Sequence, residues 1–416
     1  MKLIIEGGKR LEGTTKVQSA KNSVLPLLAA SILTSDKVTI EDCPNILDVK
    51  NMLKILSRLG MKVSGVSSVT VEGELSINEV PKDLAGELRS SIFLLGAILS
   101  VKKKAKIAYP GGCDIGLRPI DIHINGLKAL NVKINESFGF VECDATDMKA
   151  NDILLDLPSV GATENLIMAS VFLRGKTTLR NVAKEPEIVD LSNMLNLMGA
   201  KISGAGTSVI EIVGVDSMRG VTYKPIPDRI VAGTLLFATA TCGGEIELTN
   251  VIAEHVFPLT AKLLQNSCKL DCKYDKIRLT SNGRLNAVDL IETSPYPGFP
   301  TDMQAQVMAS LLTARGTSVV VENLFETRFK HVPEYNKMGA DVTVRGNTAI
   351  VRGVQRLSGA EVVAKDLRGG AGLVIAGLKA EGVTTVLDVR HIDRGYDGIE
   401  KVLQKLGATI RRISYE

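Results

Sequence analysis

Residues 109–124, YPGGCDIGLRPIDIHI, combine side chains suited to acid–base and anion chemistry with three glycines. Glycine allows backbone conformations that other residues avoid, so we expect this segment to be a loop that can close over a site as a lid. It contains Cys113, and Arg118 follows a few residues later. A cation near a thiol favours the reactive thiolate. We therefore expect Cys113 to be functional, since a structural cysteine would more often lie in a helix or strand.

Cations also mark the starts of helices that are predicted to be buried. Lys21, Arg89 and Arg368 lie at such starts. A helix N-terminus carries partial positive charge, so a cation there costs roughly 0.3–1 kcal/mol unless an anion is near. Backbone N–H groups and cations aimed together bind phosphate or carboxylate. The pattern predicts an anion pocket; the alternative is that these side chains simply reach solvent.

The cysteines and histidines show no metal-ligand or triad spacing. The six cysteines lie at positions 43, 113, 143, 242, 268 and 272, and no pair is spaced C-x-x-C. The four histidines, at 123, 255, 331 and 391, form no HExxH motif. A zinc site or a disulfide framework is therefore disfavoured, and the cysteines other than Cys113 are expected to be mostly reduced core residues.

Several other classes of function are disfavoured by charge and composition. The net charge is +4, from 50 basic residues dispersed among 46 acidic ones, and aromatic residues make up 4%. Nucleic-acid binding usually needs a basic face, and binding of single strands also needs stacking rings. The one basic run, Lys102–Lys104 with Lys106, is interpreted as a solvated surface turn. The segments RGKTT and GAGTSV lack glycines that the P-loop and dinucleotide motifs require.

No segment is predicted to cross a membrane. The longest apolar runs, Val24–Leu33 and Ile92–Val101, have ten residues each, about half of a bilayer span. The N-terminus turns acidic at Glu6, before any apolar signal core could form. We expect a soluble cytoplasmic protein without nucleic-acid or membrane partners.

A helix-to-strand hinge recurs six times along the chain. The copies lie at Gly60, Asn131, Gly199, near Cys268, at Gly339 and at Gly407, at intervals of 71, 68, 69, 71 and 68 residues. Each unit reads as an apolar helix, a strand, an amphipathic helix and two strands. The apolar helix should be buried, and the amphipathic helix should keep one face in solvent. In two later units the loops equivalent to the Cys113 segment carry Arg328 and Arg394.

Six such units most simply form two domains of three. The Pro-rich stretch YKPIPD, Tyr223–Asp228, should be extended and is the expected boundary. The opening strand Leu3–Glu6 precedes the first complete unit. It is expected to complete the sheet of the last unit, which returns the N-terminus to the second domain.

The motifs SAKNSVLPLLAAS, PGGCDIGLRPIDIHINGL, SVGAT, GFPTDMQAQ, FETRFKHVPEYNKMGAD, KDLRGGAGLVIAGL and HIDRGYDGIEKVLQKLGA occur in this order. Together they closely resemble the UDP-N-acetylglucosamine 1-carboxyvinyltransferase family. The resemblance implies an α/β fold of two inside-out α/β barrels with six βαβαββ-like repeats. It assigns residues 21–226 to the N-terminal domain and residues 1–20 and 227–416 to the C-terminal domain.

The implied reaction transfers the enolpyruvyl group of phosphoenolpyruvate to the 3-hydroxyl of UDP-N-acetylglucosamine and releases phosphate, the first committed step of peptidoglycan synthesis. It proceeds by addition and elimination. No metal or organic cofactor is implied, and the partners are these two small molecules. The oligomeric state is left open.

The resemblance also implies roles for individual residues. Cys113 is similar to the proton donor, which can also bond covalently to phosphoenolpyruvate, and Asp302 is similar to the base facing the sugar hydroxyl. Lys21 and Asn22 match contacts to phosphoenolpyruvate and the sugar, and Arg118 and Arg394 match the clamp on phosphate and carboxylate. The resemblance places Lys21 and Arg394 with Cys113 and Asp302 among the catalytic residues. The UDP-sugar site is matched by Arg89, Arg118, Pro119, Ile120, Asp121, Ile122, Ser159, Val160, Gly161 and Leu324. Arg328, Asp366 and Arg368 match polar substrate-site positions in the C-terminal domain.

Two departures and three alternatives accompany this interpretation. Phe93 stands where relatives often have tryptophan, and the pair Leu157 and Pro158 lacks a lysine that some relatives have. The first alternative is the sister family, 3-phosphoshikimate 1-carboxyvinyltransferase, whose glycine-rich signatures are absent. The second is a non-catalytic paralogue that binds UDP-sugar. A pure repeat scaffold, the third, would need neither cationic helix starts nor a cysteine loop.

Overall fold

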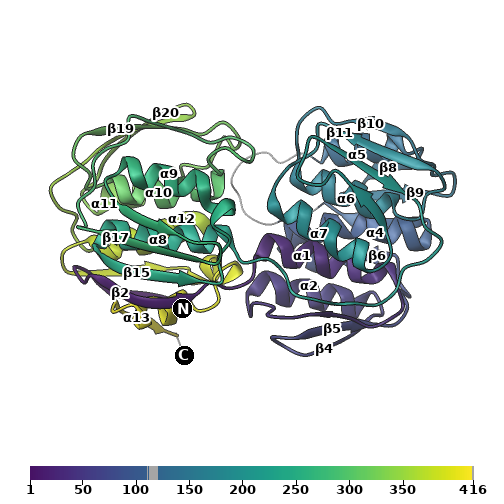
Figure 1. Ribbon diagram of the computed structural model, residues 1–416, viewed down its shortest axis with the longest axis horizontal. Helices are drawn as coiled ribbons and strands as arrows, with labels where there is room; N and C mark the ends of the chain where they lie inside the picture. Colours follow the sequence, from purple (N-terminus) through teal and green to yellow (C-terminus); the bar gives the residue numbers. More distant parts are fainter. Residues whose placement is uncertain (110, 112–119, 415–416) are drawn as a thin grey trace. The chain divides into compact units, whose positions relative to one another are not determined.

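The computed structural model describes residues 1–109, 111 and 120–414. The described chain divides into two compact units (Figure 1). The N-terminal unit contains residues 19–109, 111 and 120–226, and the C-terminal unit contains residues 1–18 and 227–414. The chain passes from one unit to the other after Gln18 and again after Ile226, inside the Pro-rich stretch.

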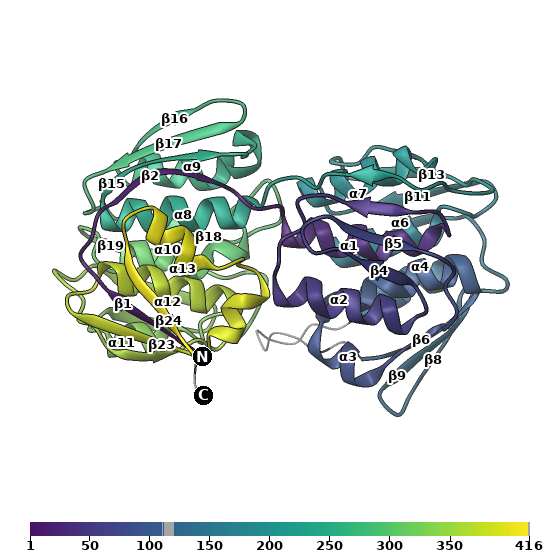
Figure 2. The ribbon, with the colours of Figure 1, turned by 90° about the horizontal axis from the view of Figure 1, so that it is seen from below.

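Three apolar helices form the centre of each unit, as Figures 1 and 2 show for the C-terminal set. In the N-terminal unit they are α1 (Lys21–Ala30), α4 (Phe93–Lys102) and α6 (Val160–Ser170). In the C-terminal unit they are α8 (Arg229–Cys242), α10 (Gln304–Leu311) and α12 (Leu367–Lys379). Almost every residue of these helices is buried, as predicted from their uniformly apolar sequences.

A four-stranded sheet accompanies each of these helices. The sheets of the N-terminal unit have the orders β14 (Thr222–Tyr223), β3 (Val38–Ile40), β5 (Val69–Glu72), β4 (Lys62–Ser64); β6 (Glu79–Val80), β7 (Lys104–Ala108), β9 (Phe140–Asp144), β8 (Lys133–Ser137); and β10 (Asp152–Leu154), β11 (Lys176–Arg180), β13 (Val209–Val213), β12 (Lys201–Ser203). In each sheet the first strand pairs parallel to the second, and the remaining pairs are antiparallel.

The C-terminal unit repeats this pattern. Its sheets have the orders β2 (Leu11–Lys16), β15 (Gly244–Thr249), β17 (Lys276–Ser281), β16 (Lys269–Cys272); β18 (Leu290–Glu292), β19 (Thr317–Val321), β21 (Thr348–Arg352), β20 (Asp341–Arg345); and β22 (Glu361–Val363), β23 (Val383–Leu387), β1 (Lys2–Glu6), β24 (Thr409–Ile413). The predicted unit of helix, strand, helix and two strands is confirmed. Each sheet also has a fourth strand, the one named first in each order above, which pairs parallel to its neighbour.

Amphipathic helices follow the second strand of each sheet. They are α2 (Leu47–Arg58), α5 (Asp121–Ala129), α7 (Pro186–Leu197), α9 (Phe257–Gln265), α11 (Val332–Lys337) and α13 (Ile399–Lys405); the short α3 (Lys82–Glu87) precedes α4. In α2 the side chains of Met52 and Ile55 are buried, whereas Lys50 and Lys54 are exposed. One face therefore packs inward, as the helical spacing predicts.

The predicted hinges coincide with left-handed backbone. Gly60, Asn131, Gly199, Gly339 and Gly407 have φ values of 100, 68, 113, 87 and 96°. At the fourth hinge the left-handed residue is Ser267, at 72°, one position before the predicted Cys268. A left-handed residue ends each amphipathic helix and turns the chain into the next strand, which explains why glycine dominates these positions.

The N-terminal strand β1 lies inside the last sheet of the C-terminal unit. Leu3 pairs with Val386 of β23 on one side and with Arg412 of β24 on the other. The prediction that this strand completes the sheet of the last unit is confirmed. In Figure 2 the purple β1 lies beside the yellow strands of the chain's end.

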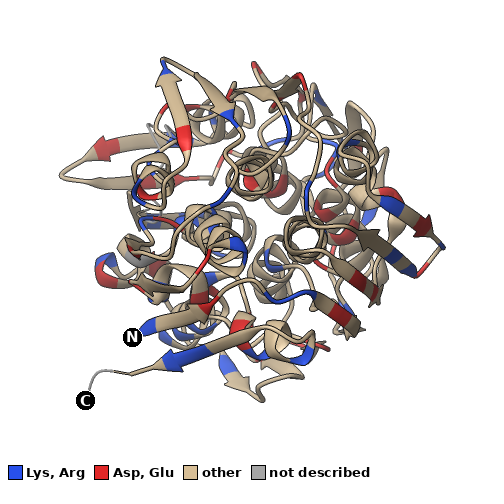
Figure 3. Cartoon of the chain, turned by 90° about the vertical axis from the view of Figure 1, so that its left-hand side faces the viewer, with Lys and Arg blue, Asp and Glu red and all other residues tan. Residues whose placement is uncertain are grey.

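Charged residues of both signs are interspersed along the described elements (Figure 3). The basic run at the end of α4 is exposed, and two of its lysines pair with acidic residues of β9: Lys104 with Asp144 at 3.7 Å and Lys106 with Glu142 at 3.2 Å. The run therefore lies at the surface, as predicted, but Lys104 and Lys106 belong to the strand β7 and not to a turn. No helix among the described residues is long and apolar enough to span a bilayer.

Candidate active site

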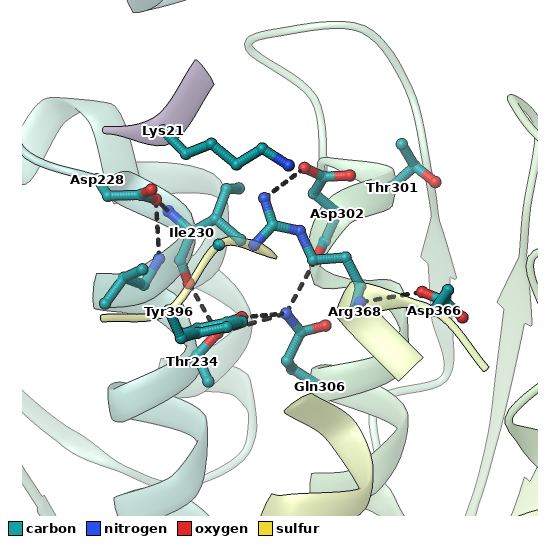
Figure 4. Close-up of polar contacts among 12 residues, drawn as sticks. Lys21, Asp228, Ile230, Thr234, Thr301, Asp302, Gln306, Asp366, Arg368 and Tyr396 are labelled. Atoms are coloured by element: carbon teal, nitrogen blue, oxygen red, sulfur yellow. Dashed lines mark hydrogen bonds and ion pairs between the residues drawn. The ribbon is translucent and has the colours of Figure 1, made fainter. Parts of the chain in front are cut away.

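Asp302 lies between two arginines in the C-terminal unit, Arg328 and Arg368. Figure 4 shows its contact with Arg368. Its Oδ1 accepts a hydrogen bond from Arg328 Nη2 at 2.8 Å, and its Oδ2 accepts one from Arg368 Nη2 at 2.8 Å. Both arginine side chains are only 4% exposed, whereas Asp302 is 28% exposed. The site therefore presents one carboxylate to solvent and keeps two cations directly behind it.

Helix ends position these groups. Asp302 belongs to the single turn η4 (Thr301–Met303) that leads into α10. Asp366 caps α12, since its Oδ1 accepts the N–H groups of Arg368 and Gly369 at 2.9 Å. Asp228 caps α8 in the same way through Ile230 and Val231, at 2.8 and 3.0 Å. Caps of this kind satisfy N–H groups that a helix leaves open, and they complement its dipole.

A buried hydroxyl network connects the starts of these helices. Tyr396 Oη lies 2.8 Å from Thr234 Oγ1, and Gln306 Nε2 donates to the Asp302 carbonyl at 2.9 Å (Figure 4). The Arg368 guanidinium lies 5.8 Å from the centroid of the Tyr396 ring. Burial lowers the pKa of Arg368, but Asp302, Tyr396 and Asp228 outweigh it and raise that pKa. Arg368 is therefore a permanent cation.

Sequence analysis did not single out Glu322, which joins two parts of this site. Its Oε2 accepts from Thr301 Oγ1 at 2.9 Å, next to Asp302, and its Oε1 accepts the backbone N–H of Leu324 at 2.9 Å. The predicted UDP-sugar residue Leu324 is 41% exposed and is held through this carboxylate. A buried acid directly after a strand was the available signal.

Among residues 1–109, 111 and 120–414, neither ring nitrogen of the buried His331 has a hydrogen-bond partner. Its ring packs edge-on against Tyr335, with centroids 5.0 Å apart. Burial lowers the pKa of His331 to about 4; Asp366 opposes this shift and Arg328 adds to it. The ring is therefore neutral near pH 7 and serves as packing beside the α12 cap.

In the N-terminal unit, Lys21 is the first residue of α1 and pairs with Asp48 of α2. Its Nζ lies 2.6 Å from Asp48 Oδ2, and the two side chains are 11% and 1% exposed. Lys21 and Arg368 thus both have a carboxylate of their own unit as the anion that a helix start requires. Asn22 follows in α1 and is half-buried.

The starts of α5 and α6 meet around Gly161. A Cβ added at Gly161 would lie 3.0 Å from the Phe93 ring and 3.3 Å from Cε1 of His123, so both rings pack on this backbone. Ser159 caps α6 by accepting the N–H of Ala162 at 3.3 Å. Of the predicted UDP-sugar residues, Gly161 therefore lies against Phe93, which stands where relatives often have tryptophan.

His123 is held as a neutral acceptor in this region. Its Nδ1 lies 3.1 Å from Asn165 Nδ2, while Asn165 Oδ1 accepts the Gly96 N–H at 2.6 Å, which fixes the amide orientation. Burial, assisted by the charge of Arg89, lowers the pKa of His123 to about 3. Arg89 is the first residue of the single turn η2 (Arg89–Ile92) and is half-buried.

The remaining predicted residues fall into two groups. Ile120, Asp121 and Ile122 lie at the start of α5, where Ile120 is buried and Asp121 is exposed. Arg394 is half-buried at the end of η5 (Val389–Arg394) in the C-terminal unit. The predicted residues Cys113, Arg118 and Pro119 lie outside the described residues.

Most of the other cysteines are buried, as predicted. Cys43, Cys143 and Cys268 are buried, whereas Cys242 is half-buried and Cys272 is exposed. Cys272 lies on β16, which forms the outer edge of its sheet. Within the described residues, no group of three or more His, Cys, Asp or Glu side chains is arranged to hold a metal ion.

Comparisons with known proteins identify relatives over almost the full chain. The family model described as EPSP synthase (3-phosphoshikimate 1-carboxyvinyltransferase) matches residues 5–403. The chain is 51% identical over 414 residues to UDP-N-acetylglucosamine 1-carboxyvinyltransferase 2 of Caldanaerobacter subterraneus subsp. tengcongensis, covering 99% of each chain. It is 48% identical over 417 residues to the protein of the same name from Carboxydothermus hydrogenoformans, again covering 99% of each.

A solved structure supports the same grouping. The enolpyruvyl transferase NikO from Streptomyces tendae has a TM-score of 0.88 and 25% identity, with 99% of this chain and 98% of that chain covered. The predicted fold class is confirmed. The curated relatives favour the predicted family over its sister, whose name the family model carries. The chain belongs to the UDP-N-acetylglucosamine 1-carboxyvinyltransferase family of enolpyruvyl transferases.

Proposed function

We propose that this chain transfers the enolpyruvyl group of phosphoenolpyruvate to the 3-hydroxyl of UDP-N-acetylglucosamine and releases phosphate. The observation that carries the proposal is Asp302, a partly exposed carboxylate with a guanidinium bonded to each oxygen. The names of the curated relatives support the choice of substrates. A base beside fixed positive charge is what addition to an anionic enol phosphate requires.

Asp302 is the proposed base. As the sugar hydroxyl oxygen attacks C2 of phosphoenolpyruvate, its proton passes to Asp302. Each carboxylate oxygen accepts one guanidinium hydrogen bond and keeps a second lone pair, so the hydroxyl can donate to Asp302 while both arginines stay bound. The two guanidiniums also stabilise negative charge on the bound substrates. We accordingly assign Arg328 and Arg368 first to holding Asp302 and only then to substrate.

Cys113 is the proposed acid. It protonates C3 in the addition step, and it can also bond covalently to C2. In the elimination step C3 loses a proton and phosphate leaves with the electrons of its C–O bond, which yields the enolpyruvyl ether. Lys21, Arg118 and Arg394 are proposed to bind the phosphate and carboxylate of phosphoenolpyruvate. No step in this sequence requires a metal or an organic cofactor.

The UDP-sugar is proposed to bind to the residues that the resemblance implies for it. They are Asn22, Arg89, Arg118, Pro119, Ile120, Asp121, Ile122, Ser159, Val160, Gly161, Asp302, Leu324 and Asp366. We also propose that the protein acts in the cytoplasm, since the described cysteines form no disulfide, as is usual in a reducing compartment.

The test is phosphate release by purified protein with phosphoenolpyruvate and UDP-N-acetylglucosamine. Release that depends on both substrates is expected. Shikimate 3-phosphate in place of the UDP-sugar should give none, and release with that acceptor alone would replace the proposal with the sister activity. Tight binding of UDP-sugar without turnover would instead indicate a non-catalytic paralogue.

Variants test the two proposed proton-transfer residues. Asp302→Asn and Cys113→Ala should each lower kcat by roughly 10²- to 10⁴-fold, the usual contribution of a general acid or base. Circular dichroism should show intact folds. A variant with the parent kcat would remove that residue from its proposed role.

A further inference from the structure

Arg412 of β24 makes four charge-assisted hydrogen bonds. Its Nη1 and Nη2 donate to the two carboxylate oxygens of Asp393 at 2.8 and 2.7 Å. Its Nε and Nη2 donate to the two oxygens of Glu400 at 3.0 and 2.9 Å. A guanidinium held by two carboxylates in this bidentate way has a fixed orientation, which a lysine could not reproduce.

The two carboxylates come from the two elements that follow β23. Asp393 belongs to η5, and Glu400 is the second residue of α13. The side chains of Arg412, Asp393 and Glu400 are 23%, 22% and 8% exposed, so solvent screens these pairs only in part. Arg412 therefore ties β24, η5 and α13 together and sets the separation between the two ends of the segment 394–399.

Arg394 is the first residue of that segment and the direct neighbour of Asp393. On its other side the segment is held by Gln18, whose Nε2 donates to the Gly395 carbonyl at 3.1 Å and whose Oε1 accepts the Asp397 N–H at 3.0 Å. The backbone that carries Arg394 is thus fixed by hydrogen bonds on both sides, at Asp393 and at Gly395 and Asp397. The bonds of Arg412 to Asp393 join charged groups, whereas those of Gln18 do not.

We propose that Arg412 is a positioning residue for Arg394 and thereby sets the affinity for phosphoenolpyruvate. The inference rests on the proposed function, in which Arg394 binds the phosphate and carboxylate of that substrate. Without the guanidinium, Asp393 and Glu400 would be two partly buried carboxylates near each other. Their repulsion would separate η5 from α13 and move Arg394 away from the anion that it binds.

The experiment compares the steady-state kinetics of Arg412→Met and Glu400→Gln with those of the parent protein. For Arg412→Met we expect KM for phosphoenolpyruvate to rise roughly 10- to 100-fold, the scale of a displacement of about 1 Å at a binding group. KM for UDP-N-acetylglucosamine should stay close to the parent value. Glu400→Gln removes one of the two charged partners, so its effect should be intermediate, and Arg412→Lys should recover only part of the loss.

Arg352→Met is the matched control. Arg352 lies in β21 of a neighbouring sheet and pairs with Asp341 at 3.2 Å, with about half of both side chains exposed. It should leave both KM values unchanged. Calorimetry at the assay temperature checks that each variant is folded, and Glu400→Gln carries the test if Arg412→Met does not fold.

Two results would overturn the inference. One is a folded Glu400→Gln or Arg412→Met protein with the parent KM for phosphoenolpyruvate. The other is an equal change in both KM values, which would indicate a purely structural role. If the parent protein itself shows no turnover with the two substrates, the proposed function fails instead, and the variants do not enter that conclusion.

Discussion

The contacts of Asp302 show more about its role than its sequence motif does. The sequence motifs predict Asp302, Arg328 and Arg368 as separate members of a substrate site. In the structure they form one ionic group, in which two nearly buried guanidiniums occupy both oxygens of the carboxylate. The anion that holds these two cations in the described structure is therefore the proposed base itself.

A second residue, His331, gives a prediction for pH dependence. Its pKa is about 4 in the folded chain, mainly because of burial, compared with an ordinary value of 6.5. Between pH 4 and pH 6.5 the unfolded chain binds more protons at His331 than the folded chain does. The free energy of unfolding is therefore highest above about pH 6.5 and decreases as the pH falls through this range. The slope contributed by one such group reaches about 1.4 kcal/mol per pH unit. His331→Gln should make the loss of stability between about pH 6.5 and pH 4 shallower.

Calorimetry of the parent and His331→Gln proteins between pH 8 and pH 4.5 measures this effect. At pH 8 His331 is neutral in both the folded and the unfolded chain. The stability difference between the parent and His331→Gln proteins at that pH therefore reports packing alone. A stability difference that does not change between pH 8 and pH 5 would show that His331 does not titrate on unfolding.

The contacts between residues that are distant in the chain were the part of the site that could not be predicted from the sequence. Arg412 lies 12 residues from Glu400, and Arg368 lies 66 residues from Asp302, so only the folded chain brings them together. Motifs identified Asp302 and Arg368 because the chemistry depends on them. Glu322 and Arg412 act through neighbours; the position of Glu322 directly after β19 is a weak signal, and nothing in the local sequence of Arg412 marks its role.

At the scale of elements, the helix-to-strand hinges were predictable because left-handed backbone favours glycine and asparagine, which stand at five of the six hinges. Five of the six predicted positions have positive φ, and the sixth is displaced by one residue to Ser267. The short strands β6 and β14, of two residues each, leave no alternating pattern, so their positions could not be read from the residues themselves.

Ser267 offers a test of the hinge argument. A non-glycine residue in the left-handed region costs roughly 1–2 kcal/mol. Ser267 also accepts an exposed hydrogen bond from Asn286 at 2.7 Å, which glycine would lose. Ser267→Gly should therefore stabilise the C-terminal unit by about 1 kcal/mol, seen as a higher calorimetric Tm.

Gly199→Ser is the reciprocal variant. It places serine at the equivalent hinge of the N-terminal unit, where φ is 113° and an added Cβ would meet no atom closer than 3.9 Å. Its cost should therefore come from the backbone conformation alone. Equal Tm values for either variant and its parent would contradict the hinge argument.

At the scale of the whole molecule, β1 makes the C-terminal unit depend on both ends of the described chain. Leu3 and Ile5 are fully buried between β23 and β24, whereas Glu6 is exposed. Ile5→Asp would bury an unpaired charge, which costs several kcal/mol. We expect it to abolish the calorimetric transition of the C-terminal unit and to leave that of the N-terminal unit in place.

Glu6→Lys is the control in the same strand, and it should leave both transitions unchanged. Loss of both transitions in Ile5→Asp would show that the two units do not fold separately. Retention of both would show that β1 contributes little to the sheet of the last unit.

The position of β1 also determines the order in which the protein can be completed during synthesis. The ribosome makes β1 before the other described strands, whereas its partners β23 and β24 are the last of them. The N-terminal unit is contained within residues 19–226, so it can fold while the remaining chain is still being made. Throughout that time Leu3 and Ile5 stay unpaired and apolar. The newly made protein therefore depends on an apolar N-terminal segment remaining unaggregated until the last strand emerges.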